Sequence, residues 1–163
     1  MEAGQLIVGM DDYVARWVAE KIPHAPDFGE CTTMAAVSGN RILAGFVYTD
    51  YMKKYDTIQL SMAAVSPLWA KRETMRGVLA YAFEQLGCFK VWLAIAIEND
   101  MMRRTTAHIG FTQEAILAHQ FGENNHAVVE RMLRPDFHRI FGEEKDNGQV
   151  QQRLSITAAA GSC

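Results

Sequence analysis

The stretch that most constrains the fold of this chain runs from residue 89 to residue 111 and is typical of a strand followed by a short helix. Apolar residues occupy both faces of the predicted strand: Phe89, Val91, Leu93, Ile95 and Ile97 on one, Trp92, Ala94 and Ala96 on the other. A strand that is apolar on both faces is typical of one that is covered on both sides. Asn99 or Asp100 can cap the helix that follows, and Gly110 can end it in the left-handed conformation. The stretch predicts an α/β fold but no particular chemistry.

The length and the charge of the chain limit the classes of protein to which it can belong. The chain has 163 residues, which is enough for one domain with a single core. Its formal charge is −3, so a broad nucleic-acid-binding surface is not expected. No apolar run is long enough to span a membrane, and no basic-then-apolar leader opens the chain. We therefore expect a cytoplasmic protein with no membrane association and no nucleic-acid partner.

Cysteine and histidine spacing does not indicate a metal site. Cys31, Cys88 and Cys163 are odd in number and lack a Cys-x-x-Cys pair, and no two histidines stand four residues apart as a helical ligand pair would. Cys88 is expected to pack as a small apolar residue. We predict no metal cofactor.

Periodicity and turn residues predict the remaining elements. Their expected order is a strand at 5–10, a helix from Asp11 to about Lys21, strands at 31–37 and 42–48 joined by Gly39-Asn40, a polar connection at 50–56, a strand at 57–65, a helix from Lys71 to Leu86, and, after Gly110, a hairpin of strands at 111–120 and 127–133. These elements predict one α/β (α+β) domain over residues 1–142. It would hold a mixed, mostly antiparallel sheet of about seven strands with helices on both faces. Residues 143–163 are expected to form a flexible tail.

The order of these elements over roughly residues 5–135 resembles the GNAT (GCN5-related N-acetyltransferase) family. Within that family, four features resemble the ribosomal-protein alanine acetyltransferase branch: Val65-Ser66-Pro67-Leu68-Trp69, the segment at 81–87, Asn99 placed eleven residues before Gly110-Phe111, and Glu114. The N-terminal half also resembles GNAT-like proteins encoded by phages and prophages. The resemblance implies a GNAT fold that uses acetyl-CoA and an amine acceptor.

The resemblance places acetyl-CoA between strands 57–65 and 89–97, with its pyrophosphate on the turn before helix 71–86. The residues it implies for cofactor binding are Ala64, Val65, Trp69, Ala70, Lys71, Arg72, Thr74 and Asn99. The family's turn is rich in glycine, whereas this chain has Ala70-Lys71-Arg72-Glu73 there. Either the charges of Lys71 and Arg72 replace the backbone cradle, or cofactor binding is lost. Trp69 could shield the pantetheine arm or plug the end of the sheet.

Candidate catalytic residues are Thr106, His108 and Glu98. Thr106 stands where many family members have a tyrosine acid, and Met102 stands where the alanine branch has a serine, so neither usual acid is present. His108 has a suitable pKa but is also consistent with an exposed helix histidine. Glu98, like Asp50 and Asp56, could act as a base through water or be an ordinary surface carboxylate. Positioning alone can support amine acetylation, so a missing base does not exclude activity.

Two classes of function follow from these residues. The first is direct acetyl transfer from acetyl-CoA to a primary amine, which could be a protein N-terminus, a lysine or a small amine. The alternative is a catalytically inactive GNAT-fold protein with a structural or binding role, for instance in a phage. Transfer of another acyl group, or modification of a nucleobase by a GNAT-like fold, is a weaker possibility. The final hairpin could pair its edge with a second copy and form a homodimer.

Overall fold

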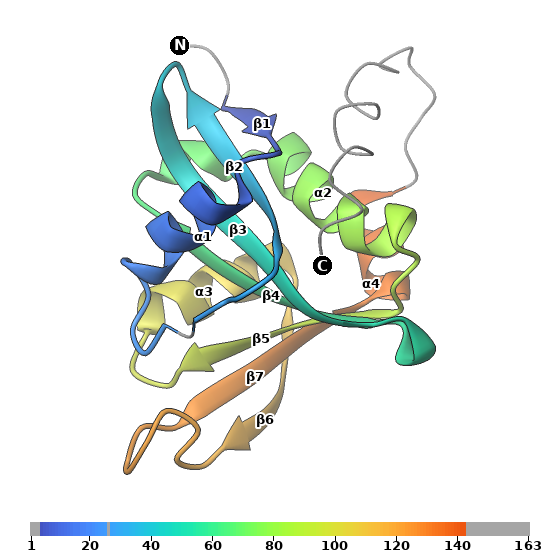
Figure 1. The fold of residues 1–163 in the computed structure, drawn as a ribbon. Helices are drawn as coiled ribbons and strands as arrows, with labels where there is room; N and C mark the ends of the chain where they lie inside the picture. The colour runs from blue at the N-terminus through green and yellow to red at the C-terminus, as the bar shows by residue number, and fades with distance from the viewer. Residues whose placement is uncertain (1–3, 26, 143–163) are drawn as a thin grey trace.

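The computed structural model describes residues 4–25 and 27–142, which form a twisted mixed sheet flanked by helices (Figure 1). The strands are β1 (Gln5–Ile7), β2 (Thr32–Ser38), β3 (Arg41–Met52), β4 (Thr57–Ala64), β5 (Lys90–Ala96), β6 (Thr112–Leu117) and β7 (Ala127–Leu133). The α-helices are α1 (Asp11–Ala19), α2 (Arg72–Ala80), α3 (Asp100–Ile109) and α4 (Arg134–Phe141). The sheet order is β1-β2-β3-β4-β5-β7-β6. The prediction of a seven-stranded α/β domain is confirmed.

One junction joins the two halves of the sheet. β4 and β5 are parallel and pair through three residues each, Thr57–Gln59 on β4 with Lys90–Trp92 on β5. Just before this junction, the carbonyl of Asp56 accepts hydrogen bonds from the backbone N–H groups of Phe89 (2.7 Å) and Lys90 (3.1 Å). Every other neighbouring pair in the sheet is antiparallel. The halves β1–β4 and β5–β7–β6 are thus held together at one end of β4 and β5.

The main core lies between the sheet and the helices α2, α3 and α4. Its large buried side chains include Phe46, Tyr48, Leu60, Phe83, Leu93 and Phe137. The buried Tyr48 hydroxyl donates to the Val78 carbonyl at 2.6 Å, so the polar atom at this depth has a partner. Cys88 is fully buried here, as predicted, and burial raises the pKa of its thiol to about 11. Removal of this apolar surface from water is the main force that holds the helices on the sheet.

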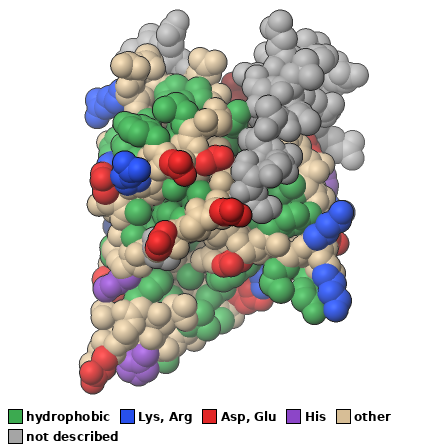
Figure 2. All heavy atoms as spheres, viewed as in Figure 1, with side chains coloured by type: hydrophobic (Ala, Val, Ile, Leu, Met, Phe, Trp, Pro, Cys, Tyr) green, Lys and Arg blue, Asp and Glu red, His purple; other side chains and the backbone are tan. Residues whose placement is uncertain are grey.

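The opposite face is covered only in part. Helix α1 packs on β2, β3 and β4 around Val14, Val18 and Val47, and leaves β5 uncovered on this side. Trp92 and Ala94 of β5 are therefore half-buried, and the expectation that β5 is covered on both faces is wrong for this face. Figure 2 shows acidic side chains gathered over the region of α1 and below it. The apolar residues on the open face of β5 line a cavity instead of a core.

Three predicted boundaries are corrected. The α-helical part of the helix predicted at 71–86 ends at Ala80 and continues as a π-helical turn, Tyr81–Gln85. The connection predicted at 50–56 is strand in its first part, because β3 continues to Met52 through an irregularity between Thr49 and Met52, and Lys53–Tyr55 then form a 3-10 turn. Bulges of this kind add residues to a strand without ending it. The first strand is also shorter than predicted and ends at Ile7.

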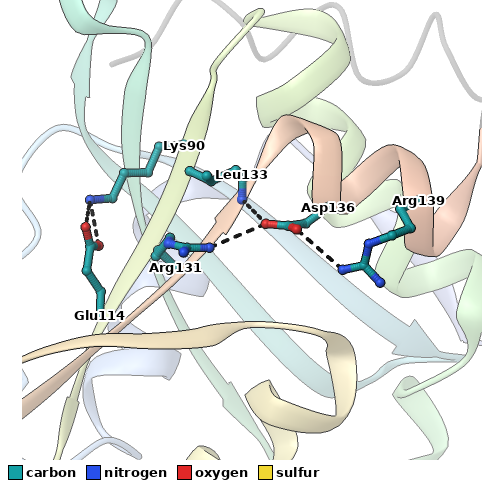
Figure 3. Close-up of polar contacts among 6 residues, drawn as sticks. All are labelled: Lys90, Glu114, Arg131, Leu133, Asp136 and Arg139. Carbon is teal, nitrogen blue, oxygen red and sulfur yellow. Dashed lines mark hydrogen bonds and ion pairs between the residues drawn. The ribbon is translucent and has the colours of Figure 1, made fainter.

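Helix α4 is not among the predicted elements, and Pro135 stands in its first turn. Proline is compatible with the first turn of a helix, where its missing N–H has no partner to lose. The Asp136 carboxylate accepts a hydrogen bond from the Leu133 N–H at 3.1 Å and lies 3.4 Å from both the Arg131 and the Arg139 guanidinium (Figure 3).

Figure 3 also shows an ion pair between Lys90 of β5 and Glu114 of β6, which lie 2.7 Å apart across the intervening β7. The predicted tail at 143–163 lies outside the described residues.

No helix in the described part of the chain is long and apolar enough to span a membrane.

Close packing of α1 depends on a row of small residues across three strands. Gly45 of β3 is paired with Ala35 of β2 and with Ala63 of β4. A Cβ at position 45 would lie 2.6 Å from Val18 Cγ2 and 3.3 Å from Val14 Cγ1. The helix approaches the sheet at a distance that only glycine permits at this site.

We predict that Gly45→Ala lowers the free energy of unfolding by about 1–3 kcal/mol, because α1 must shift to make room for a methyl group. Urea denaturation followed by circular dichroism measures this change. Gly4→Ala is the matched control, since a Cβ there would meet Leu43 at an ordinary 3.4 Å. Equal stabilities of the two variants would show that α1 does not need this close approach.

Candidate active site

The candidate site begins where β4 and β5 separate. Beyond the pair of Gln59 and Trp92, the two strands diverge and leave a narrow slot between them. The slot is lined by Leu60, Ser61 and Met62 of β4, by residues 93–96 of β5, and by Asn99 and Met102 at the start of α3. Backbone N–H and C=O groups alternate in direction along a strand, so the diverging strands expose some of theirs to the slot. An extended ligand could satisfy these groups by lying between the strands.

Helices α2 and α3 begin after the carboxyl ends of β4 and β5, and the start of α3 lines the slot through Asn99 and Met102. Helix α2 follows β4 and helix α3 follows β5, and the carboxyl ends of parallel strands lie at the same edge of a sheet. The first backbone N–H groups of each helix have no partner within the helix, and the helix dipole is positive there. Asn99 caps α3 through its side-chain oxygen, which accepts from the Met102 N–H at 3.2 Å. This edge of the sheet therefore favours negatively charged groups.

The residues of the turn before α2 that the resemblance implies for cofactor binding differ in their exposure to solvent. Ala64, Val65, Ala70 and Lys71 are exposed, whereas the Thr74 side chain is buried in the first turn of α2. Trp69 is also buried and packs edge-on against Phe46 at 5.4 Å between ring centroids. Trp69 could either shield the pantetheine arm or close the end of the sheet, and its buried position favours the second role.

Arg72 does not point toward an open phosphate site. Its guanidinium donates to the Ile140 carbonyl of α4 at 2.6 Å and lies 5.3 Å above the Phe141 ring. Arg72 therefore ties the start of α2 to the end of α4. Lys71 is exposed on the same turn, and its side chain forms no hydrogen bond or ion pair with any residue in 4–25 and 27–142. Of the two basic residues expected to replace the glycines, Lys71 is the one available for a ligand.

A wider cavity of about 350 Å³ lies next to the slot, on the face that carries α1. Ile22, Pro23, Ser61 and Ala94 line both spaces, so the slot and the cavity are neighbours. The rest of the cavity wall comes from four parts of the chain: the loop after α1 (His24, Asp27, Phe28), the irregular part of β3 (Thr49, Asp50), the central strands (Gln59, Trp92), and the end of β6 with the β6–β7 loop (Leu117, Gln120, Phe121). The arrangement gives a narrow slot for one reactant and a broader space for another.

A histidine–carboxylate pair stands at the edge of this cavity. The His24 Nε2 atom lies 3.4 Å from Glu98 Oε1, and the His24 ring stacks on Phe121 at 5.4 Å with an interplanar angle of 9°. The pKa of the exposed Glu98 carboxyl is lowered, chiefly by a hydrogen bond from its own backbone N–H and also by His24. A lowered pKa makes Glu98 a weaker base, but it leaves the carboxylate ionised to orient the imidazole.

Thr106 and His108 lie elsewhere. Thr106 is fully buried on α3, and its hydroxyl is hydrogen-bonded to the buried Glu130 carboxylate of β7. The same hydroxyl lies 3.1 Å from the Met102 carbonyl. His108 is exposed in the last turn of α3, as an ordinary helix histidine would be. The geometry favours structural roles for Thr106 and His108.

Sequence reasoning missed Glu130 and His24 as functional candidates. A single glutamate between Val129 and Arg131 in an apolar strand is a weak signal of a buried polar contact. His24 stands in a loop between two prolines and gave no signal, because its partner Glu98 is 74 residues away. Over residues 4–25 and 27–142, no group of three or more histidine, cysteine or acidic residues is placed to hold a metal ion.

No protein-family model and no curated protein sequence matches this chain. Solved structures do match. A variant of the spermidine N-acetyltransferase SpeG from Vibrio cholerae aligns with a TM-score of 0.65 at 13% identity, over 83% of this chain and 96% of that one. The same Vibrio cholerae enzyme in complex with CoA and spermine aligns with a TM-score of 0.57 at 16% identity, over 67% and 69% of the two chains. A further protein, provisionally named an acetyltransferase, has a TM-score of 0.68 at 16% identity over 86% and 88%. The fold of this chain is thus that of the GNAT acetyltransferases.

We predict that Thr106→Val lowers the free energy of unfolding by about 1–3 kcal/mol, because the buried Glu130 loses its hydroxyl donor while the volume is kept. Chemical denaturation measures the effect. Thr105→Val is the matched control, since the half-buried Thr105 hydroxyl donates only to the Met101 carbonyl one helical turn earlier. A loss of acyl transfer at unchanged stability in the Thr106 variant would instead support a catalytic role.

Proposed function

We propose that this chain is an acetyl-CoA-dependent N-acetyltransferase that moves an acetyl group directly to a primary amine. The observation that carries the proposal is the separation of β4 and β5 after three residue pairs, which creates a slot next to a wider cavity. The thioester arm of acetyl-CoA would lie in the slot and the amine would enter from the cavity. The likeness in fold to N-acetyltransferases, one of them in complex with CoA, supports this assignment.

Direct transfer requires the two reactants to meet between β4 and β5. The amine nitrogen attacks the thioester carbonyl carbon, the carbon–sulfur bond breaks, the nitrogen loses a proton and the CoA thiolate gains one. Ser61 and Ala94 line both spaces and mark the place where the reacting atoms would come together. Holding two reactants in this geometry can supply a large part of the rate enhancement.

His24 is the group best placed to receive the proton of the amine, directly or through water. It lines the cavity, and Glu98 beside it orients the ring and stabilises the imidazolium that would form. In this arrangement, Glu98 acts through His24 and not as the base itself. We assign no acid for the thiolate, since the Thr106 hydroxyl faces Glu130 in the core.

A second candidate function is a GNAT-fold protein that binds a partner without transferring acetyl groups. Two observations favour it: Arg72 is engaged by α4, and the turn before α2 lacks the glycines that let a backbone approach a phosphate closely. The two candidates differ in whether acetyl-CoA binds. The narrower placements, in the ribosomal-protein alanine acetyltransferase branch or among phage proteins, rest on sequence motifs alone.

We also propose a cytoplasmic location and a homodimer formed through the edge strand β6. Ile116 and Leu117 of this strand are exposed, and an edge strand offers unpaired backbone groups to a second copy. Size-exclusion chromatography with light scattering tests the dimer. A monomer at all concentrations would contradict it.

Calorimetric titration of the full chain with acetyl-CoA and with CoA tests the proposed function. We expect binding in the micromolar range, which a glycine-poor turn can provide if Lys71 and the N-termini of α2 and α3 hold the phosphates. No heat of binding and no thermal shift at millimolar ligand would rule out the transferase and leave the binding protein.

We predict that Lys71→Ala weakens acetyl-CoA binding by about tenfold, the loss expected for one charge-assisted contact with a phosphate. The single variant is preferable to one that also changes Arg72, because Arg72 holds α4. Lys54→Ala is the matched control: Lys54 is an exposed lysine at the opposite, closed end of the strands, 5.4 Å above the Tyr55 ring. Equal affinities of both variants would exclude Lys71 from the site.

A further inference from the structure

We propose that the loop between β6 and β7, residues 118–126, is a pH-sensitive wall of the wider cavity (Figure 1). Protonation of His119 and His126 would break two hydrogen bonds that shape this loop and release Phe121 from the cavity. The proposal rests on the proposed function only in naming an amine as the ligand that the cavity admits. The change in the loop itself is independent of that function.

Each of the two imidazole rings accepts a hydrogen bond from a backbone N–H group. The His119 N–H donates to His126 Nδ1 at 2.9 Å, and the Asn124 N–H donates to His119 Nδ1 at 2.9 Å. The two rings lie edge to face, with 4.8 Å between their centroids and an interplanar angle of 68°. The two bonds form a chain from Asn124 through His119 to His126, which joins the tip of the loop to its base.

These hydrogen bonds require both rings to be neutral. A neutral imidazole has one nitrogen that accepts, whereas an imidazolium has N–H groups on both nitrogens and no acceptor. Because Nδ1 accepts in His119 and in His126, the single proton of each neutral ring is assigned to Nε2. A second proton on Nδ1 would face the backbone N–H that now donates to it. The loop must then separate the two groups, and its present conformation belongs to the neutral rings.

The remaining hydrogen bonds within the loop are local. They join residues no more than four positions apart, for example the Phe121 N–H to the Asn125 carbonyl at 2.9 Å. At the base, the His126 carbonyl accepts from the Ile97 N–H at 3.0 Å, which fixes the end of the loop beside β5. The bond between His119 and His126 instead spans the whole loop. Without it, the tip can swing as a unit while the base stays in place.

Phe121 connects this loop to the cavity. Its ring lines the cavity and stacks on the His24 ring at 5.4 Å with an interplanar angle of 9°. His24 in turn lies 3.4 Å from the Glu98 carboxylate. A swing of the tip would carry Phe121 away from His24 and remove one side of the cavity wall. The protonation of the loop therefore changes the shape of the space and the support of His24 together.

Carboxylates near the loop favour the opposite state to the two hydrogen bonds. The pKa of the exposed Glu98 carboxyl is lowered, first by a hydrogen bond from its own backbone N–H, then by His24 and by the charge of His126. An ionised Glu98 attracts an imidazolium, so it stabilises the protonated loop. The titratable groups that face the loop or share its cavity are Glu98 from the turn after β5, His24 and Asp27 from the loop after α1, Asp50 from β3, and Glu123 from the loop itself.

The direction of the pH effect follows from these opposing contacts. Histidine ordinarily changes its charge between about pH 5 and pH 8. The hydrogen bonds to neutral rings hold the wall at the upper end of this range, and they are lost as the pH falls. The carboxylates then stabilise the released loop. We expect an ordered cavity wall near pH 8 and a released one near pH 5.

Amide hydrogen exchange measured by NMR on the full chain tests the proposal, because both donors are backbone N–H groups. Protection factors correct for the intrinsic effect of pH on exchange, so they report the hydrogen bonds alone. We expect those of the His119 and Asn124 amides to be about tenfold lower near pH 5 than near pH 8. Equal protection of the wild-type amides at both pH values would overturn the proposal.

The double variant with His119→Asn and His126→Asn supplies acceptors that do not titrate. An asparagine side chain has an accepting oxygen near the position of Nδ1, and asparagine tolerates the left-handed conformation of residue 119, whose φ is +56°. We expect its protection factors to be the same at both pH values. His138→Asn is the matched control, since His138 is an exposed histidine of α4, and it should keep the wild-type response. An equal loss of protection in the double variant would overturn the proposal.

The contact between the Phe121 and His24 rings tests the second step. We expect nuclear Overhauser effects between these rings near pH 8 and their loss near pH 5 in the wild-type protein. The double variant should keep them at both pH values, although its His24 still titrates. Wild-type ring contacts that persist near pH 5 would overturn the release of Phe121. Neither measurement needs acetyl-CoA, so a failure to bind acetyl-CoA would contradict the proposed function alone.

Discussion

The rest of the structure depends on how briefly β4 and β5 pair. Two parallel strands that stayed together to their ends would close the sheet and leave no space between its halves. Here the Asp56 carbonyl and three residue pairs hold one end, and the strands separate after Gln59 and Trp92. The separation creates the slot, exposes backbone groups to it and leaves room for the start of α3, whose Asn99 and Met102 line it. The antiparallel partners on either side keep each strand fixed as it diverges.

The two faces of the sheet differ in how completely helices cover them. The face under α2, α3 and α4 carries the main core, including a buried Thr106–Glu130 contact that links a helix to the sheet. The face under α1 is covered only over β2–β4, where Ala35, Gly45 and Ala63 let the helix lie close. Beyond α1, the open part of this face becomes the cavity wall. Stability is thus concentrated on one side, and the other side is free to vary in shape and charge.

Much of the fold could be predicted from the sequence, because its signals are local. The alternating apolar residues of β5 and the spacing of Val78, Leu79 and Phe83 on the helix after β4 specify their elements directly. The site was harder to predict, since its key contacts join distant residues: Thr106 and Glu130 are 24 positions apart, and the His24–Glu98 pair spans a still longer separation. Periodicity carries no information on such pairs. The sequence suggested Arg72 as a phosphate ligand for the same reason: its partner, Ile140, lies in a helix that was not predicted.

The left-handed backbone at position 50 restricts what this site can become. Glycine, asparagine, aspartate and histidine are the residues that adopt such a conformation most readily, so the bulge in β3 favours a small set of side chains. Within this set, an exchange of aspartate for asparagine changes charge without changing size. A single-nucleotide change in a codon can make this exchange. The charge of the cavity wall at this position can therefore change in one mutational step, with the fold left intact.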